Sequence, residues 1–193
     1  MRPRTQTMKR ALASRLAAAA AGTGLALTAL VAVAGSASAT GSPTVATFTI
    51  TAGTLGISVP GTATLVTGTV NTGATTAAGQ LGPVSVSDTR GLLVNSWTAT
   101  VNTSTFTTGT ATADETVAQA NVAYASGLAT TTSGLGAFVP TTSTPITSTG
   151  ITAASWTGLA GNDSATWDPT LTFRLIPSQV AGTYSGTVTH SVA

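Results

Sequence analysis

Residues Asp168–Val192 have the sequence DPTLTFRLIPSQVAGTYSGTVTHSV, and its alternation of apolar and polar side chains predicts two strands. In the first strand, Leu171, Phe173 and Leu175 share one face. In the second, apolar positions alternate with serine and threonine. The corner Pro177–Gly182 between them predicts an antiparallel pair that packs on a second layer.

The rest of the chain shows the same strand pattern and no window with helical periodicity. We expect a hairpin of residues 46–50 and 55–59, a turn at 88–91, and a long strand over 93–101. Residues 126–149 are rich in Gly, Ser, Thr and Pro and receive no assignment or role. About eight short strands without helices predict an all-β fold, a Greek-key β-sandwich of immunoglobulin-like type.

The N-terminal region has the pattern of a secretory signal peptide. Basic residues precede an apolar run from Leu16 to Ala34, and the small residues Ala37 and Ala39 follow it. We expect cleavage after Ala39, which leaves residues 40–193 as a single domain. An uncleaved membrane anchor is the alternative, although the run is only marginally long and apolar for a span.

Charge and composition exclude several classes of function. Five of the seven basic residues precede position 40, so residues 40–193 carry two arginines against five acidic residues, a net charge of −3. This balance argues against nucleic-acid binding, and we expect no membrane span in the mature chain. With one His, one Glu and no Cys, the sequence also predicts no enzyme activity and no cofactor.

Aromatic side chains offer the first candidate site. Trp97, Trp156 and Trp167 could form a platform on which a sugar ring stacks, and this would suit a cell-wall ligand. Because Trp97 and Trp167 share strand faces with Leu93 and Leu171, we favour packing in the core.

Polar residues offer two further candidates. Asn162, Asp163 and Asp168 could hold a calcium ion through loop oxygens, but the same residues are typical of a tight turn, so we predict no metal. The single histidine, His190, lies on the apolar face of its strand, where we expect it to be packed and neutral.

A contact between Asp88 and Arg90 is expected to pin the sheet. The reason is the small number of cations, since Arg174 is the only other basic residue after position 39.

Four segments together resemble the WxL-domain surface proteins of Gram-positive bacteria, particularly secreted actinobacterial relatives. They are LGISVP (55–60), VSVSDTRG (84–91), SWTATV (96–101) and AGTYSGTVTHSV (181–192). The chain departs from the family's Trp-x-Leu motifs, because it has Trp97-Thr98-Ala99 in the first and His190-Ser191-Val192 in the second.

The resemblance implies a secreted β-sandwich that is extracellular or associated non-covalently with the cell wall. Its implied partners are peptidoglycan or another cell-wall glycan, and other surface proteins. The alternative is a structural subunit of an extracellular fibre or adhesive assembly built by β-strand addition. Threonine-rich strands of low charge, without lysine to protect their edges, favour that alternative.

Overall fold

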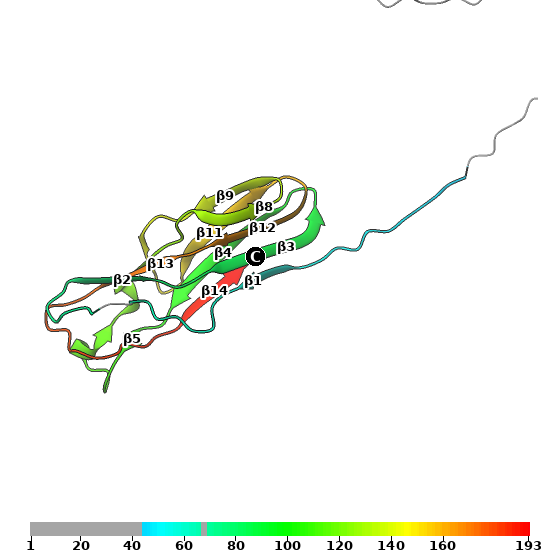
Figure 1. Cartoon of the computed structure of the whole chain (residues 1–193). Coiled ribbons are helices and arrows are strands. Elements are labelled where there is room, and N and C mark those ends of the chain that lie inside the picture. Colours follow the sequence, from blue (N-terminus) through cyan, green and yellow to red (C-terminus); the bar gives the residue numbers. More distant parts are fainter. Residues whose placement is uncertain (1–43, 67–68) are drawn as a thin grey trace, which may run out of the picture. The chain divides into compact units, whose positions relative to one another are not determined.

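A computed structural model describes residues 44–66 and 69–193 of the 193-residue chain (Figure 1). The predicted signal peptide and its cleavage residues Ala37 and Ala39 lie outside the described residues. The chain divides at Thr47 into two compact units, and the second, Phe48–Ala193, contains every strand described below. No helix in the described part of the chain has the length and hydropathy to cross a bilayer.

The described chain is all-β, with strands grouped into antiparallel sheets. Sheet A has the order β1-β3-β12-β8, sheet B the order β10-β7-β13-β2, and sheet C the order β14-β4-β11-β9; β5 and β6 form a small fourth sheet. The bounds are β1 Leu55–Ser58, β2 Thr76–Gln80, β3 Val84–Leu92, β4 Ser96–Thr103, β5 Phe106–Thr107, β6 Thr116–Val117, β7 Val122–Ala125, β8 Ala129–Ser133, β9 Gly136–Pro140, β10 Thr144–Pro145, β11 Ile151–Gly158, β12 Gly161–Trp167, β13 Thr170–Arg174 and β14 Val188–Val192. Two single-turn 3₁₀ helices, η1 Ala113–Glu115 and η2 Gln119–Asn121, precede β6 and β7.

Sheets A and B are two halves of one longer sheet with a crease between them. Three short connections lead directly from one half to the other, from β2 to β3, from β7 to β8 and from β12 to β13. Pro83 and Pro169 interrupt two of these passages because proline cannot donate to the ladder, and Gly82 takes a positive φ of 91°. The Asp168 carboxylate accepts the Gly82 N–H at 3.1 Å and so joins the two sides of the crease.

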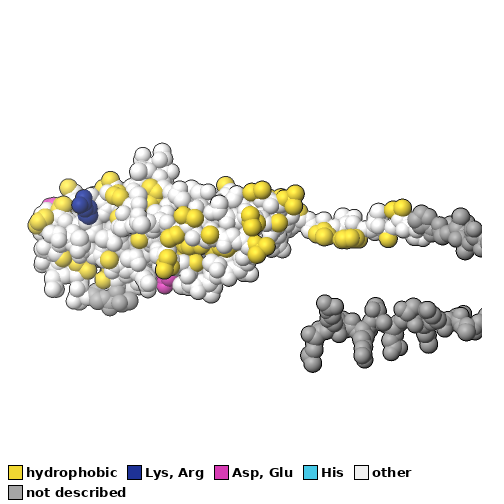
Figure 2. All heavy atoms as spheres, turned by 90° about the horizontal axis from the view of Figure 1, so that it is seen from above, with side chains coloured by type: hydrophobic (Ala, Val, Ile, Leu, Met, Phe, Trp, Pro, Cys, Tyr) yellow, Lys and Arg dark blue, Asp and Glu magenta, His cyan; other side chains and the backbone are white. Residues whose placement is uncertain are grey.

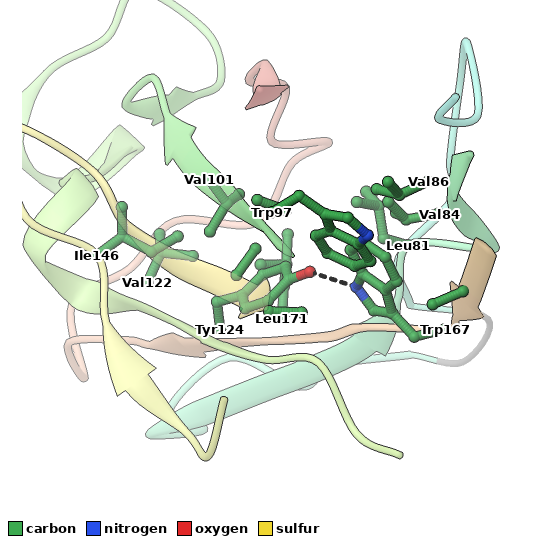
Figure 3. Packing of buried hydrophobic residues seen from close by; sticks show 14 of the residues in the cluster. Leu81, Val84, Val86, Trp97, Val101, Val122, Tyr124, Ile146, Trp167 and Leu171 are labelled. Carbon is green, nitrogen blue, oxygen red and sulfur yellow. Dashed lines mark hydrogen bonds between the residues drawn. The ribbon is translucent and has the colours of Figure 1, made fainter. Parts of the chain in front are cut away.

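Sheet C contributes the second layer of the core. Its Trp97 stacks both on Trp156 of the same sheet and on Trp167 of sheet A. Figure 3 shows Trp97 and Trp167 together in the core. Tyr124 of sheet B contacts His190 of β14. At the sides, β1 lies beside β14 and β8 beside β9. Antiparallel sheets that share one buried core are compatible with a β-sandwich.

The C-terminal stretch forms both expected strands, but they do not pair with each other. Leu171 and Phe173 are buried on one face of β13, as predicted. The second strand is shorter than expected, because β14 begins only at Val188. It pairs with β4 in sheet C, whereas β13 lies in sheet B, so the corner Pro177–Gly182 crosses between sheets instead of closing a hairpin.

Other local predictions are also corrected. Residues 46–50 form no strand, and β1 pairs with β3 instead of forming the predicted hairpin. The predicted turn at 88–91 is part of β3, and the unassigned stretch 126–149 contains β8, β9 and β10. These errors share one cause, since short threonine-rich runs have the same alternation whether or not a partner strand is available.

Candidate functional site

Two buried carboxylates face each other across neighbouring strands of sheet A. Asp88 of β3 is directly opposite Asp163 of β12, and the two residues are 0% and 6% exposed. Side chains in such opposed positions lie about 5 Å apart, so their charges repel unless other groups compensate. The surrounding residues supply that compensation unequally.

Arg90 neutralises Asp88. The Arg90 guanidinium donates from Nε to Oδ1 at 3.0 Å and from Nη2 to Oδ2 at 2.6 Å, and its backbone N–H donates to Oδ1. These hydrogen bonds lower the pKa of the Asp88 carboxyl below its ordinary value of 3.8. The predicted contact between Asp88 and Arg90 is therefore confirmed, within a strand instead of a turn.

Asp163 has neutral partners. Its Oδ1 accepts the indole N–H of Trp97 at 2.8 Å, and its Oδ2 accepts the Asn95 amide at 2.6 Å. Burial raises the pKa of the Asp163 carboxyl, and the nearby Asp88 charge raises it further, against the lowering effect of the Trp97 hydrogen bond. The pair thus combines one carboxyl of lowered pKa with one of raised pKa.

Two neighbouring carboxyls whose pKa values are shifted in opposite directions are typical of acid–base catalysis, but here the geometry favours a structural role. Two cavities of the described chain, one beside β4 and β14 and one at the sheet B end, are not lined by Asp88 or Asp163. The two carboxyls fix Arg90, Asn95 and Trp97 at the end of sheet A.

The calcium candidates do not converge on one point. Asp163 and Asp168 lie five residues apart along β12 and its end, a separation of roughly 16 Å at the rise of an extended strand. The Asp163 carboxyl accepts hydrogen bonds from Trp97 and Asn95, and the Asp168 carboxyl accepts one from Gly82. Asn162 is exposed. Among the described residues no group of three His, Cys, Asp or Glu side chains could hold a metal ion.

The three tryptophans are buried in the core, so their faces do not form a surface platform. Trp97 lies between the other two, with ring centroids 6.5 Å from Trp156 and 6.2 Å from Trp167, and the planes are nearly parallel. All three are at most 3% exposed. The structure places them where the core interpretation of the sequence expects them.

His190 ends a buried chain of polar contacts. Trp167 Nε1 donates to the Tyr124 hydroxyl at 2.9 Å (Figure 3). His190 Nε2 lies 3.2 Å from the same oxygen. Burial lowers the pKa of His190 to about 4 and raises that of Tyr124, so both are neutral near pH 7. No partner for His190 Nδ1 is present among the described residues. A packed and neutral histidine agrees with the expectation from the sequence.

A groove of about 740 Å³, whose lining is polar and apolar in about equal parts, opens at the sheet B end of the domain. Its floor belongs to β2 and β13, one wall to residues 60–66 and 70–74, and the other to residues 179–188. None of its lining residues is charged, and the apolar ones include Leu65, Leu81, Phe106, Phe173, Leu175 and Val188. The volume falls within the roughly 300–1,000 Å³ of typical ligand pockets.

A second apolar surface, which we name the apolar end, lies where β3, β8 and β11 finish. It consists of Leu93, Val94, Leu135 and Leu159, which are all largely exposed. Backbone hydrogen bonds from Leu159 to Leu135 and from Asn95 to Leu159 hold the three connecting segments together.

The extended segment Phe48–Ala52, which we name the arm, leads into β1 beside the apolar end. Phe48 and Ile50 are 87% and 83% exposed, and no backbone hydrogen bond joins the arm to another described residue. Figure 2 shows hydrophobic side chains along this segment and at the end of the domain that it adjoins. Large exposed apolar surfaces of this kind mark sites of interaction.

Comparison of the chain with protein-family models, curated proteins and solved structures finds no match. The resemblance to WxL-domain proteins therefore remains a prediction. Sequence reasoning missed the groove, the apolar end and the unpaired arm. The sequence did contain a signal for the apolar end. Leu93 and Val94 are adjacent, and consecutive apolar residues cannot share one buried strand face.

Proposed function

We propose that this chain is a secreted, non-enzymatic surface protein that associates non-covalently with the cell envelope through the apolar end. The observation that carries the proposal is the gathering of Leu93, Val94, Leu135 and Leu159 on three neighbouring connections. The proposed protein has a cleaved signal peptide, residues 1–39, followed by a single domain, residues 40–193, of Greek-key, immunoglobulin-like type. The resemblance to WxL-domain proteins suggests peptidoglycan, another wall glycan or other surface proteins as partners.

Binding of the secreted protein to isolated cell walls tests this proposal. The double variant Leu93→Asp/Leu159→Asp should lose at least tenfold in the fraction that sediments with the walls, because both charges enter the apolar end. The matched control is Leu128→Asp, which places the same charge on a leucine that is also exposed but lies outside the apolar end. Equal binding by all three proteins, or no binding by the unmodified protein, would reject wall association through this surface.

A second function, a structural subunit assembled by strand addition, is favoured by the arm. Phe48 and Ile50 alternate with Thr49 and Thr51 as in a strand with one buried face, yet the segment has no partner strand among the described residues. Sedimentation velocity of the secreted protein at increasing concentration tests it. A single monomeric species throughout would reject assembly.

A further inference from the structure

We infer that residues 46–52 of one copy insert as a β-strand into the groove of a second copy, beside β2. This inference rests on the second proposed function, and it specifies the donor segment, the acceptor site and the partner. Its basis is that the described chain carries both an extended segment with the side-chain alternation of a strand and a sheet edge without a partner strand.

The missing strand position follows from the path of the chain after β1. In sheet A, β1 covers the outer edge of β3 through a regular ladder from Leu55 to Ser58. Pro60 and Gly61 then end the strand. Residues 59–66 then pass over a face of β2, since the Leu65 carbonyl occupies the place to which a side chain at Gly79 would point, and Pro60 approaches Gly82.

The continuing segment does not complete sheet B. Residues 59–66 make no backbone hydrogen bond to another described residue, and β2 pairs only with β13. The outer edge of β2 therefore presents backbone groups without strand partners in the described chain, next to the groove. A strand that paired there would satisfy those groups and cover the groove.

The donor segment has the matching chemistry. Ala46, Phe48, Ile50 and Ala52 alternate with threonines, so a strand formed by them has one apolar and one hydroxyl face. Neither this segment nor the lining of the groove contains a charged residue, so insertion buries no unpaired charge. Phe48 and Ile50 would contact the floor at Phe106 and Phe173, and the threonines would face water.

Connectivity requires that the donor and acceptor belong to different molecules. The arm joins β1 at Gly53, whose N–H donates to the Thr89 carbonyl, and it leaves the sheet toward the apolar end. The groove lies at the opposite end of the domain, where the strands of sheet B are. An arm could reach its own groove only if β1 left sheet A. Because donor and acceptor are different surfaces, the contact is head-to-tail and builds an open chain of subunits.

Disulfide trapping tests the inference directly, because the native chain has no cysteine. Ile50→Cys and Ala77→Cys are introduced into separate secreted proteins, which are mixed and oxidised; Ala77 lies on β2 and lines the groove. We expect a disulfide-linked heterodimer of the two variants as the main product. The matched control replaces Ile50→Cys by Thr49→Cys, which should give at least tenfold less heterodimer, since its side chain belongs to the opposite face.

A second measurement separates this inference from the proposed assembly. Phe48→Asp should abolish concentration-dependent oligomers while Thr49→Asp keeps them, and neither should change the melting temperature of the exposed-arm monomer by more than about 2 °C. Oligomers without cross-linking between positions 50 and 77 would overturn the inference and leave assembly intact. If the protein is monomeric at every concentration, both the strand insertion and the proposed assembly are overturned.

Discussion

The two ends of the long sheet differ in how their outer edge is closed. At the sheet A end, β1 pairs residue by residue with β3, and the tryptophan stack fills the space beneath. At the sheet B end, no strand of the described chain pairs with the outer edge of β2, and a groove remains beside it. Three short connections join the strands of both ends, so the difference arises at Pro60 and Gly61, where the edge strand β1 stops.

This comparison shows that a sheet can be well packed and still be incomplete. Phe106 and Phe173 meet edge to face at 4.9 Å in the sheet B end, as aromatic pairs in a core do. Both residues nevertheless line the groove. The incomplete end therefore keeps an apolar surface available for a partner, whereas the complete end encloses its aromatic residues.

Aromatic truncations at the two ends should give the largest effects and sharpen the comparison. Trp167→Ala removes a fully buried ring that stacks on Trp97 and donates to Tyr124, and it should cost about 4–5 kcal/mol of unfolding free energy. Phe173→Ala should cost about 3 kcal/mol, because the groove beside it lets its surroundings relax. Chemical denaturation of the isolated protein measures both, and a greater loss for Phe173→Ala would contradict the proposed difference.

The sheet A end also predicts opposite pH dependences for its two buried carboxyls. The pKa of Asp88 is lowered by Arg90, so its contribution to stability is present above the unfolded pKa and is lost as pH falls through the folded pKa. The pKa of Asp163 is raised by burial, so its contribution is largest below the unfolded pKa and is lost as pH rises through the folded pKa.

Denaturant unfolding of the unmodified protein, Asp88→Asn and Asp163→Asn between about pH 2 and pH 7 measures these slopes. The difference between the unmodified protein and Asp88→Asn should grow as pH rises, and the difference for Asp163→Asn should shrink. Each slope is limited to about 1.4 kcal/mol per pH unit. Slopes of the same sign would show that the two carboxyls do not form the described pair.

How far the sequence could predict this structure depends on the kind of feature. The buried face of Leu171 and Phe173 follows from alternation alone. Trp97 is interior as predicted, but the strand expected over 93–101 begins only at Ser96, and Leu93, which was expected on the same face, is exposed. Strand partners do not, because alternation defines the faces of a strand and leaves its neighbours in the sheet undetermined. For that reason the hairpin of residues 46–59 and the pairing of the last two strands were wrong.

The candidate sites show the same division. Short-range chemistry was predictable, as with Asp88 and Arg90 two residues apart on one strand. The opposed pair of Asp88 and Asp163 depends on the register between β3 and β12, which brings together residues 75 positions apart. The groove depends on the absence of a strand beside β2, and the sequence near Pro60 gives no sign of which sheet loses its edge.

His190→Phe should have a smaller effect than the aromatic truncations, because it replaces one buried ring by another. The pKa of His190 is lowered to about 4 by burial, so the histidine opposes folding as pH falls from its unfolded value of 6.5 toward 4. Phenylalanine removes that dependence, and it also removes Nδ1, which has no described partner. Thermal melts at pH 5 and pH 7 should show equal or higher stability for the variant, with a greater gain at pH 5. A loss above about 1 kcal/mol at pH 7 would show that the contact to Tyr124 is required.

The smallest effect is expected for Leu65→Ala, which tests whether residues 59–66 already close the sheet B end. Leu65 is half-buried and lies against Gly79, but its segment makes no backbone hydrogen bond to another described residue. Truncation should therefore cost less than about 1 kcal/mol in the isolated protein, whereas the control Leu171→Ala, which removes a fully buried leucine of β13, should cost about 2–5 kcal/mol. Denaturant melts of monomeric protein give both values. If Leu65→Ala proves as costly as Leu171→Ala, residues 59–66 act as a true edge element, and the two ends of the sheet are closed equally well. A small loss instead leaves the outer edge of β2 as the weakly covered part of the domain, which is the condition that a strand from a second copy requires.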